Sequence, residues 1–223
     1  GGEGLVEESF DETSFSETTS ASFGSTFYVG SVENGSAGEA TTFTYDFALD
    51  LSTSFTGEDS LDVAIIGGNA DATSVDAIMG GDGTGDDLDL DGVSYTFPLG
   101  SATVIVGDGV GPDDMNTGAC AYSAFTDLLS DCGSNNVGGS GDSGFAIGYD
   151  FGNGFTLAGG AAGDGGSATG LFTEEDASSF GLEAAYTADT YGFSVAYTDD
   201  EAITYWSLCL LYTSDAADDT CCV

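Results

Sequence analysis

Carboxylates are the only charged side chains in this sequence. Its 223 residues include 39 Asp and Glu but no Lys, Arg or His. Each carboxylate must therefore be solvated, protonated or neutralised by a dissolved cation, because no side chain can form a salt bridge with it. Without His, Lys and Arg, the chain also lacks His-based catalysis, His-ligated metals and the basic contacts that bind phosphate and nucleic acid. We expect no enzymatic activity and no nucleic-acid partner.

Two short motifs imitate known chemical sites. GDSG, Gly141 to Gly144, resembles a serine-protease motif, but the chain has no His to activate Ser143. DLDLDG, Asp87 to Gly92, opens like a calcium-binding loop, yet Pro98 stands where the bidentate Glu belongs. We therefore expect no resident metal or cofactor. The acidic loops either bind Ca²⁺ or Mg²⁺ loosely or are simply solvated.

Strict alternation of apolar and polar residues dominates the rest of the chain. TTFTYDFALDLSTSF, Thr41 to Phe55, places rings and Leu at odd positions and Thr, Asp and Ser at most even ones. A period of two is typical of β-strands with one apolar face. The pattern recurs at residues 21–29, 61–65, 93–99, 102–106, 145–151, 155–157, 180–186 and 191–197, and again from Ile203. It predicts an all-β protein with about nine or ten strands.

The links between these strands alternate between long and short. Gly30–Ala40 and Gly107–Asp142 are long, whereas Gly100–Ser101 and the turn at Asn153 are short. This favours an antiparallel up-and-down barrel whose two ends face different compartments over a β-sandwich. No Lys or Pro blunts an edge strand, and a closed barrel has no edge to protect. Aromatic residues near strand ends would form its interfacial girdles: Phe15, Tyr28, Phe55, Tyr149, Phe151, Tyr186, Tyr191 and Tyr197.

A water-filled lumen accommodates the acidic residues of the polar rows. Asp46 and Asp50 lie four residues apart on one strand, about 13 Å at 3.3 Å per residue, which exceeds the screening length of roughly 8 Å at physiological salt. In a dry core they would instead be driven towards protonation. Asp62 and Glu183 occupy the polar rows of their own strands. We predict that all four line the pore.

The cysteines suggest a pinned loop. Cys209 to Asp219 reads CLLYTSDAADD, which resembles the translated end of a sequencing-library transposon, so we interpret residues 209–223 as a non-native tail. Cys120 and Cys132 remain. A disulfide between them is worth about 3 kcal/mol and is compatible with an oxidising compartment.

Two interpretations of this pinned loop stay open. It either narrows the lumen, with Asp127 and Asp131 facing the ion path, or lies outside and is stapled against proteolysis.

Four stretches carry a resemblance to a known family. FALDLSTSFTGEDSLDV, DGVSYTFPLGSATVIVGD, GYDFGNGFTLAGG and SSFGLEAAYTADTYGFSVAY are similar to the porins of marine picocyanobacteria, which are related to the carbohydrate-selective porins. The resemblance covers about Ser14 to Leu208 and implies a transmembrane β-barrel in the outer membrane. Residues 1–13 would end the periplasmic linker that follows an S-layer-homology domain, and residues 14–208 would form an incomplete part of a larger barrel.

These observations lead to one functional hypothesis and one alternative. The hypothesis is an outer-membrane porin for passive diffusion of small hydrophilic solutes and ions, with a preference for cations because its wall is acidic. Outer-membrane lipid and solutes are its expected partners, and the full-length protein is expected to be a homotrimer. The alternative is a secreted, acidic, β-rich surface or adhesion domain that binds Ca²⁺. Unlike the porins that it resembles, the chain has no basic residue, which argues against an anion-selective constriction.

Overall fold

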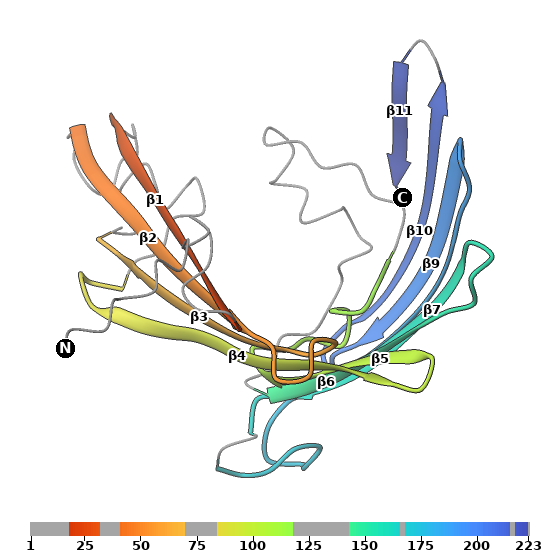
Figure 1. Ribbon diagram of the computed structural model, residues 1–223, viewed down its shortest axis with the longest axis horizontal. Coiled ribbons are helices and arrows are strands. Elements are labelled where there is room, and N and C mark those ends of the chain that lie inside the picture. Colours follow the sequence, from red (N-terminus) through yellow and green to blue (C-terminus); the bar gives the residue numbers. More distant parts are fainter. Residues whose placement is uncertain are drawn as a thin grey trace, which may run out of the picture. The chain divides into compact units, whose positions relative to one another are not determined.

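The structure, a computed structural model, describes residues 18–31, 41–69, 84–117, 143–165, 168–214 and 217–222. All regular secondary structure in these ranges is β-strand (Figure 1). None of the described residues belongs to a helix that is long and apolar enough to cross a membrane. The strands are β1 (Thr19–Ser31), β2 (Thr41–Thr53), β3 (Ser60–Gly68), β4 (Leu88–Leu99), β5 (Ala102–Asp108), β6 (Ser143–Asp150), β7 (Phe155–Gly163), β8 (Ser178–Thr187), β9 (Tyr191–Asp199), β10 (Thr204–Ser214) and β11 (Ala217–Cys222).

The strands follow one another in the sheet in chain order, from β1 to β11, and the sheet is not closed. The ladders β1–β2 and β2–β3 are antiparallel, as are the ladders between successive strands from β5 to β11. The predicted all-β, up-and-down architecture is confirmed, and the open sheet is consistent with an incomplete barrel. The chain divides into two compact units, Gly1–Val93 and Ser94–Val223.

In the first unit, the pairing register gives each strand one apolar and one polar face. Phe23 pairs with Leu49 and Phe27 with Tyr45, whereas Asp50 pairs with Ser22. Directly paired residues project from the same face, so the alternation in each strand adds up to two continuous surfaces. The apolar surface is open: Phe23 and Phe27 are 69% and 64% exposed.

The second unit carries the same inversion of the usual soluble arrangement. The apolar row of β6–β10 is exposed, and Leu182 and Trp206 reach 59% and 70%. The buried residues of these strands lie instead on the opposite face. Apart from Glu183 and Cys209 they are small, namely Ala146, Ala158, Ala162, Ala185, Ala196, Ser179, Ser194, Thr198 and Ser207. The core of this unit therefore lies on the small-residue face, and the large apolar side chains point away from it.

The link between β2 and β3 is a tight turn built around Asp59. Oδ1 of this buried carboxylate accepts hydrogen bonds from the hydroxyl of Ser54 (2.9 Å), the amide of Phe55 (3.0 Å) and the amide and hydroxyl of Thr56 (2.7 and 2.8 Å). Gly57 has a φ of +87°, which a residue with a side chain rarely adopts. The stretch STSFTGEDS thus specifies a short, rigid connection between two strands.

Strand β10 extends past Leu208, the last residue before the stretch that we interpret as a non-native tail. It pairs with β9 from Thr204 as far as Tyr212, and β11 then pairs back onto β10. Cys209 is 2% exposed and disulfide-bonded. The alternating apolar residues of this stretch are compatible with a strand whatever its origin, so the interpretation of residues 209–223 as a non-native tail stays a prediction.

Candidate functional site

Three of the acids predicted to line a lumen share the polar face of β1–β3. Asp46 pairs with Thr26 and Gly68, Asp50 with Ser22 and Ala64, and Asp62 with Ser52, so every direct neighbour on this face is polar or small. Asp50 is exposed, whereas Asp46 and Asp62 are half-exposed. The hydroxyl of Ser60 donates to both carboxylate oxygens of Asp62, at 2.8 and 2.7 Å.

The corresponding face of the second unit is a floor of glycine, alanine and small hydroxyl residues. It consists of alternate residues of four strands, residues 144–148 of β6, 156–162 of β7, 179–185 of β8 and 192–198 of β9. Glu183 is the only carboxylate on these alternate positions, and it pairs with Ala158 and Ala196. A surface with such short side chains lets another segment approach the sheet backbone closely.

Residues 109–117, which follow β5, lie on this floor; we call them the inward segment. Val110 and Pro112 are almost fully buried against it. A Cβ added to Gly160 would lie 2.8 Å from Cα of Pro112, and one added to Gly148 would lie 3.3 Å from Cβ of Met115. Gly160 is therefore required for the contact, because a side chain would occupy the place of the inward segment, whereas a side chain at Gly148 would require Met115 to shift by a few tenths of an ångström.

Glu183 holds the last described residue of the inward segment. The amide of Thr117 donates to Oε1 of Glu183 at 2.6 Å, and the hydroxyls of Thr117 and Thr156 hydrogen-bond to each other. Glu183 is only 2% exposed. It projects from the polar face, as its position in the alternation predicts, but the inward segment covers it, whereas we expected it at an open lumen wall.

A second carboxylate stabilises the shape of the inward segment. Oδ2 of Asp114 accepts the amide of Gly111 at 3.0 Å. Partial removal of water around this carboxylate raises the pKa of Asp114 above its usual value, and the hydrogen bond from Gly111 opposes the shift. Asp114 keeps more than a third of its surface exposed, so solvent screens much of this effect.

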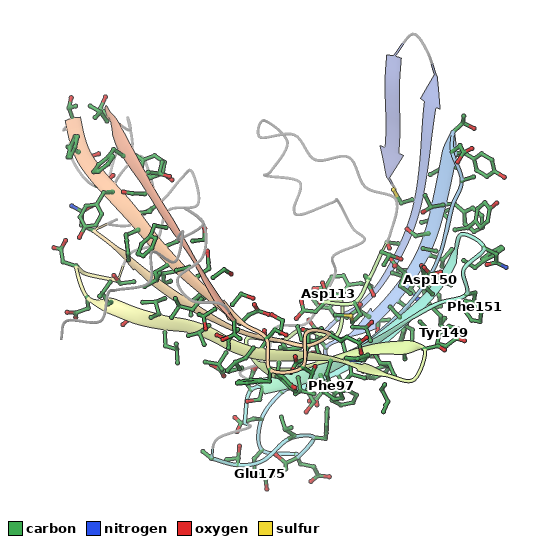
Figure 2. The ribbon with its side chains drawn as sticks, viewed as in Figure 1. Phe97, Asp113, Tyr149, Asp150, Phe151 and Glu175 are labelled. Carbon is green, nitrogen blue, oxygen red and sulfur yellow. The ribbon has the colours of Figure 1, made fainter. Side chains whose placement is uncertain are left out.

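Aromatic rings gather at the edge of the second unit where the short turns lie. Rings of Tyr149 and Phe151 are 4.7 Å apart, those of Phe155 and Tyr186 4.5 Å, and those of Tyr186 and Tyr191 5.8 Å. Figure 2 shows Tyr149 and Phe151 on one side of the sheet β5–β9 and Asp113, in the inward segment, on the other. The sequence predicts four of these five rings as strand-end aromatics, and they form one band.

Other predicted site residues lie outside the described residues, namely Cys120, Asp127, Asp131 and Cys132. In the part of the chain that the structure describes, no group of three or more His, Cys, Asp or Glu side chains is placed to hold a metal ion. The alternation in the sequence does not predict the inward segment at 109–117. Its signal is the polar row of β6–β9, which contains Gly and Ala where a solvated wall would carry Ser, Thr and Asp.

Comparison with known proteins bears on the fold. No family model matches the chain, and no curated protein matches it. Among solved structures, two mutants of Rh. blastica porin superpose with TM-scores of 0.53 and 0.54, at 16% and 15% sequence identity, over 89% of this chain and 71% of theirs. Pseudomonas putida OprB at high pH gives a TM-score of 0.50 at 12% identity, over 89% of this chain and 61% of that one.

The fold is porin-like. Each unit has a polar face opposite an exposed apolar row: in the first unit this face carries the acids of β1–β3, and in the second it is the floor of β6–β9. The inward segment lies on the floor of the second unit.

Proposed function

We propose that this chain forms part of the wall of an outer-membrane channel through which small hydrophilic solutes and ions diffuse passively. The observation that carries the proposal is the placement of the two faces. Large apolar side chains are exposed on one face, while carboxylates, hydroxyls and small residues occupy the other. In water, such an apolar face would be a large aggregation-prone patch, whereas in a bilayer it contacts hydrocarbon and the polar face contacts water.

We also propose that the channel prefers cations. Asp46, Asp50 and Asp62 place negative charge on the polar face of β1–β3, and the sequence contains no basic residue to offset it. A wall of one charge sign raises the local concentration of counter-ions and lowers that of co-ions. The inward segment adds Asp113 and Asp114 on the side of the polar floor and would narrow the passage. A homotrimer remains our expectation for the full-length protein.

Membrane fractionation tests the location. We expect the protein to sediment with outer membranes, to resist a chelator and to require detergent for extraction. Release by chelator alone would contradict the proposal and would favour the alternative, a secreted surface domain that binds Ca²⁺.

Ion selectivity tests the channel and its charge. Reversal potentials of the full-length protein in a KCl gradient should show that K⁺ permeates better than Cl⁻. The combined change of Asp46, Asp50 and Asp62 to Asn should reduce this preference, whereas Glu175→Gln, on an exposed link, should leave it unchanged. Equal permeation of K⁺ and Cl⁻ through the unaltered channel would refute cation preference.

A further inference from the structure

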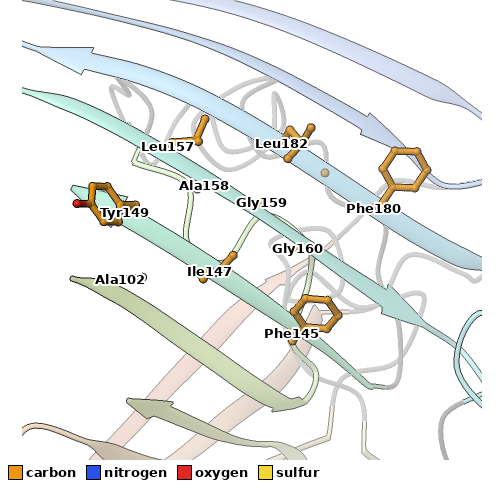
Figure 3. Close-up of a pocket in the computed structure, with 11 residues that line it drawn as sticks. Ala102, Phe145, Ile147, Tyr149, Leu157, Ala158, Gly159, Gly160, Phe180 and Leu182 are labelled. Carbon is orange, nitrogen blue, oxygen red and sulfur yellow. The ribbon is translucent and has the colours of Figure 1, made fainter. Parts of the chain in front are cut away.

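The exposed apolar face of the second unit contains a groove that follows β7 (Figure 3). Its volume is about 430 Å³, and its lining residues are apolar apart from the Tyr149 hydroxyl. In the register, Gly159 of β7 lies between Ile147 of β6 and Leu182 of β8. Gly159 has no side chain, and Leu182 leans over it: a Cβ added at Gly159 would lie 2.6 Å from Cδ2 of Leu182. The groove is bounded by the large residues of the two flanking strands.

A second hollow of about 460 Å³ adjoins the first. The two share Leu157 and Leu182 as lining residues. The second hollow lies over Ala184, which is exposed, and Trp206 forms part of its wall. Trp206 is the single tryptophan of the chain, and its ring lies 4.7 Å from that of Tyr197.

The width of the groove limits what can occupy it. β6 and β8 are separated by two strand spacings, about 9.6 Å between backbones, and the side chains of Ile147 and Leu182 take up part of that width. A helix with its side chains is about 10–12 Å across and is too wide to enter. The space suits a single flexible hydrocarbon chain that runs along the strand direction from Phe145 to Tyr149, a span of four residue steps or about 13 Å.

The charge around the groove limits the headgroup that such a hydrocarbon chain can carry. One end of the groove lies at Tyr149, in the aromatic band beside the short turns, and Asp150 follows directly in β6. Asp189 lies in the turn between β8 and β9 at the same edge of the sheet. No Lys, Arg or His is available anywhere in the sequence to bind an anionic headgroup. Asp150 pairs with Thr156 on the polar face and does not line the groove, but its charge and that of Asp189 lie at the same edge of the sheet. Like charges repel, so a headgroup without net negative charge is favoured.

We propose that this groove and the adjoining hollow beside Trp206 together bind one acyl chain of a lipid whose headgroup is zwitterionic or uncharged. The inference rests on the proposed membrane location, because acyl chains reach this face only in a bilayer. Dispersion contacts with the groove walls distinguish the bound chain from bulk lipid, since an empty groove would forfeit them. The lipid belongs to the leaflet at the short-turn edge of the sheet.

Quenching of Trp206 fluorescence tests the proposal. The protein is reconstituted in proteoliposomes that contain increasing fractions of brominated-acyl phosphatidylcholine or, separately, brominated-acyl phosphatidylglycerol. With phosphatidylcholine, we expect half-maximal quenching at a mole fraction of brominated lipid about fivefold below the value for lipids that mix randomly around the protein. With phosphatidylglycerol, we expect the value for random mixing. Ala184→Leu fills the exposed hollow beside Trp206 and should restore random mixing with phosphatidylcholine, whereas Val29→Leu, on the apolar face of β1, should change nothing.

Several results would overturn the proposal. Random mixing with both lipids would show that the groove holds no preferred chain, and equal preference for phosphatidylglycerol would remove the headgroup argument. Shielding of Trp206 that increases with protein density would assign the groove to a second copy of the chain. Failure of the protein to enter the bilayer at all is a separate outcome, visible by flotation, and it would refute the proposed function as well.

Discussion

Replacement of Glu183 should release the inward segment from the floor of β6–β9. The Thr117 amide donates to this carboxylate at 2.6 Å, and a hydrogen bond to a charged group contributes roughly 1.5–3 kcal/mol. For Glu183→Ala we take about 2 kcal/mol, which corresponds to an increase of about 30-fold in the population with the Thr117 amide open. Glu183→Gln keeps a neutral acceptor, so it should lose about half of that free energy and increase the open population about fivefold.

Hydrogen exchange at the Thr117 amide is the suitable assay, in detergent micelles at constant pH. Global stability is a poor measure here, because removal of a buried carboxylate also removes its desolvation cost and the two effects oppose each other. The local amide reports only whether Thr117 is held. Glu175→Ala serves as a matched control, since it deletes a carboxylate from an exposed link.

Two outcomes would refute this reasoning. If the Thr117 amide exchanges equally fast in the unaltered protein and in Glu183→Ala, Glu183 does not hold the inward segment. If Gln and Ala at position 183 give the same rate, the hydrogen-bond acceptor is not the relevant property, and the side chain acts only by filling space.

Three further predictions concern the pKa shift and the turns and contacts already described. The raised pKa of Asp114 means that the folded state favours the neutral carboxyl group. The contribution of this group to stability is therefore full below its usual pKa near 3.8 and is lost as pH rises through the raised pKa. Asp114→Asn should accordingly raise the melting temperature slightly at pH 7 but not at pH 3. Gly160→Ala should displace the inward segment, since the new Cβ would lie 2.8 Å from Pro112 Cα, and limited proteolysis should then cut this segment faster. Asp59→Ala should lower the free energy of unfolding by about 1–3 kcal/mol, measured by denaturant titration, because several buried donors lose their acceptor.

Each of these predictions has a control within the chain. For Asp114, the unaltered protein measured at both pH values is the reference. Gly24→Ala should leave proteolysis unchanged, because its Cβ would meet Ala48 Cβ at an ordinary 3.8 Å. Asp59→Asn retains an acceptor oxygen and should cost less than Asp59→Ala. The argument for Gly160 would be contradicted if Gly24→Ala speeded proteolysis equally, and that for Asp59 if Asn and Ala at this position cost the same free energy of unfolding. The argument for Asp114 would be contradicted if Asp114→Asn left the pH dependence of the melting temperature unaltered.

The strands and the face that each residue occupies could be predicted from the sequence. A period of two fixes the side of the sheet on which Phe47 or Asp46 lies, and short turns such as the one around Asn153 fix which strands pair. The end of β2 at Thr53, rather than at Phe55, could not be foreseen from alternation. It depends on Asp59, whose carboxylate draws the amides of Phe55 and Thr56 into the turn.

The inward segment could not be placed from periodicity, because its burial depends on shape rather than on alternation. Val110 becomes buried because Gly144 leaves room for it, and Pro112 because Gly160 and Gly181 do. Likewise, alternation assigns Glu183 to the polar face but does not predict that the inward segment covers it, since the contact with Thr117 joins residues far apart in the sequence. Such contacts depend on tertiary packing, which a pattern within one strand does not encode.

The neighbour-to-neighbour order of the strands has a consequence for folding. In every ladder whose register is described, from β1–β2 to β10–β11, a strand pairs with the strand next to it in the chain. Hairpins with short turns, such as β8–β9, close small loops and lose little chain entropy, so each can form before its neighbours do, whereas the long link between β5 and β6 costs more entropy to close. A sheet assembled in this manner can lengthen by one hairpin at either end without disturbing the ladders already made, which makes strand number an easily varied property of this architecture.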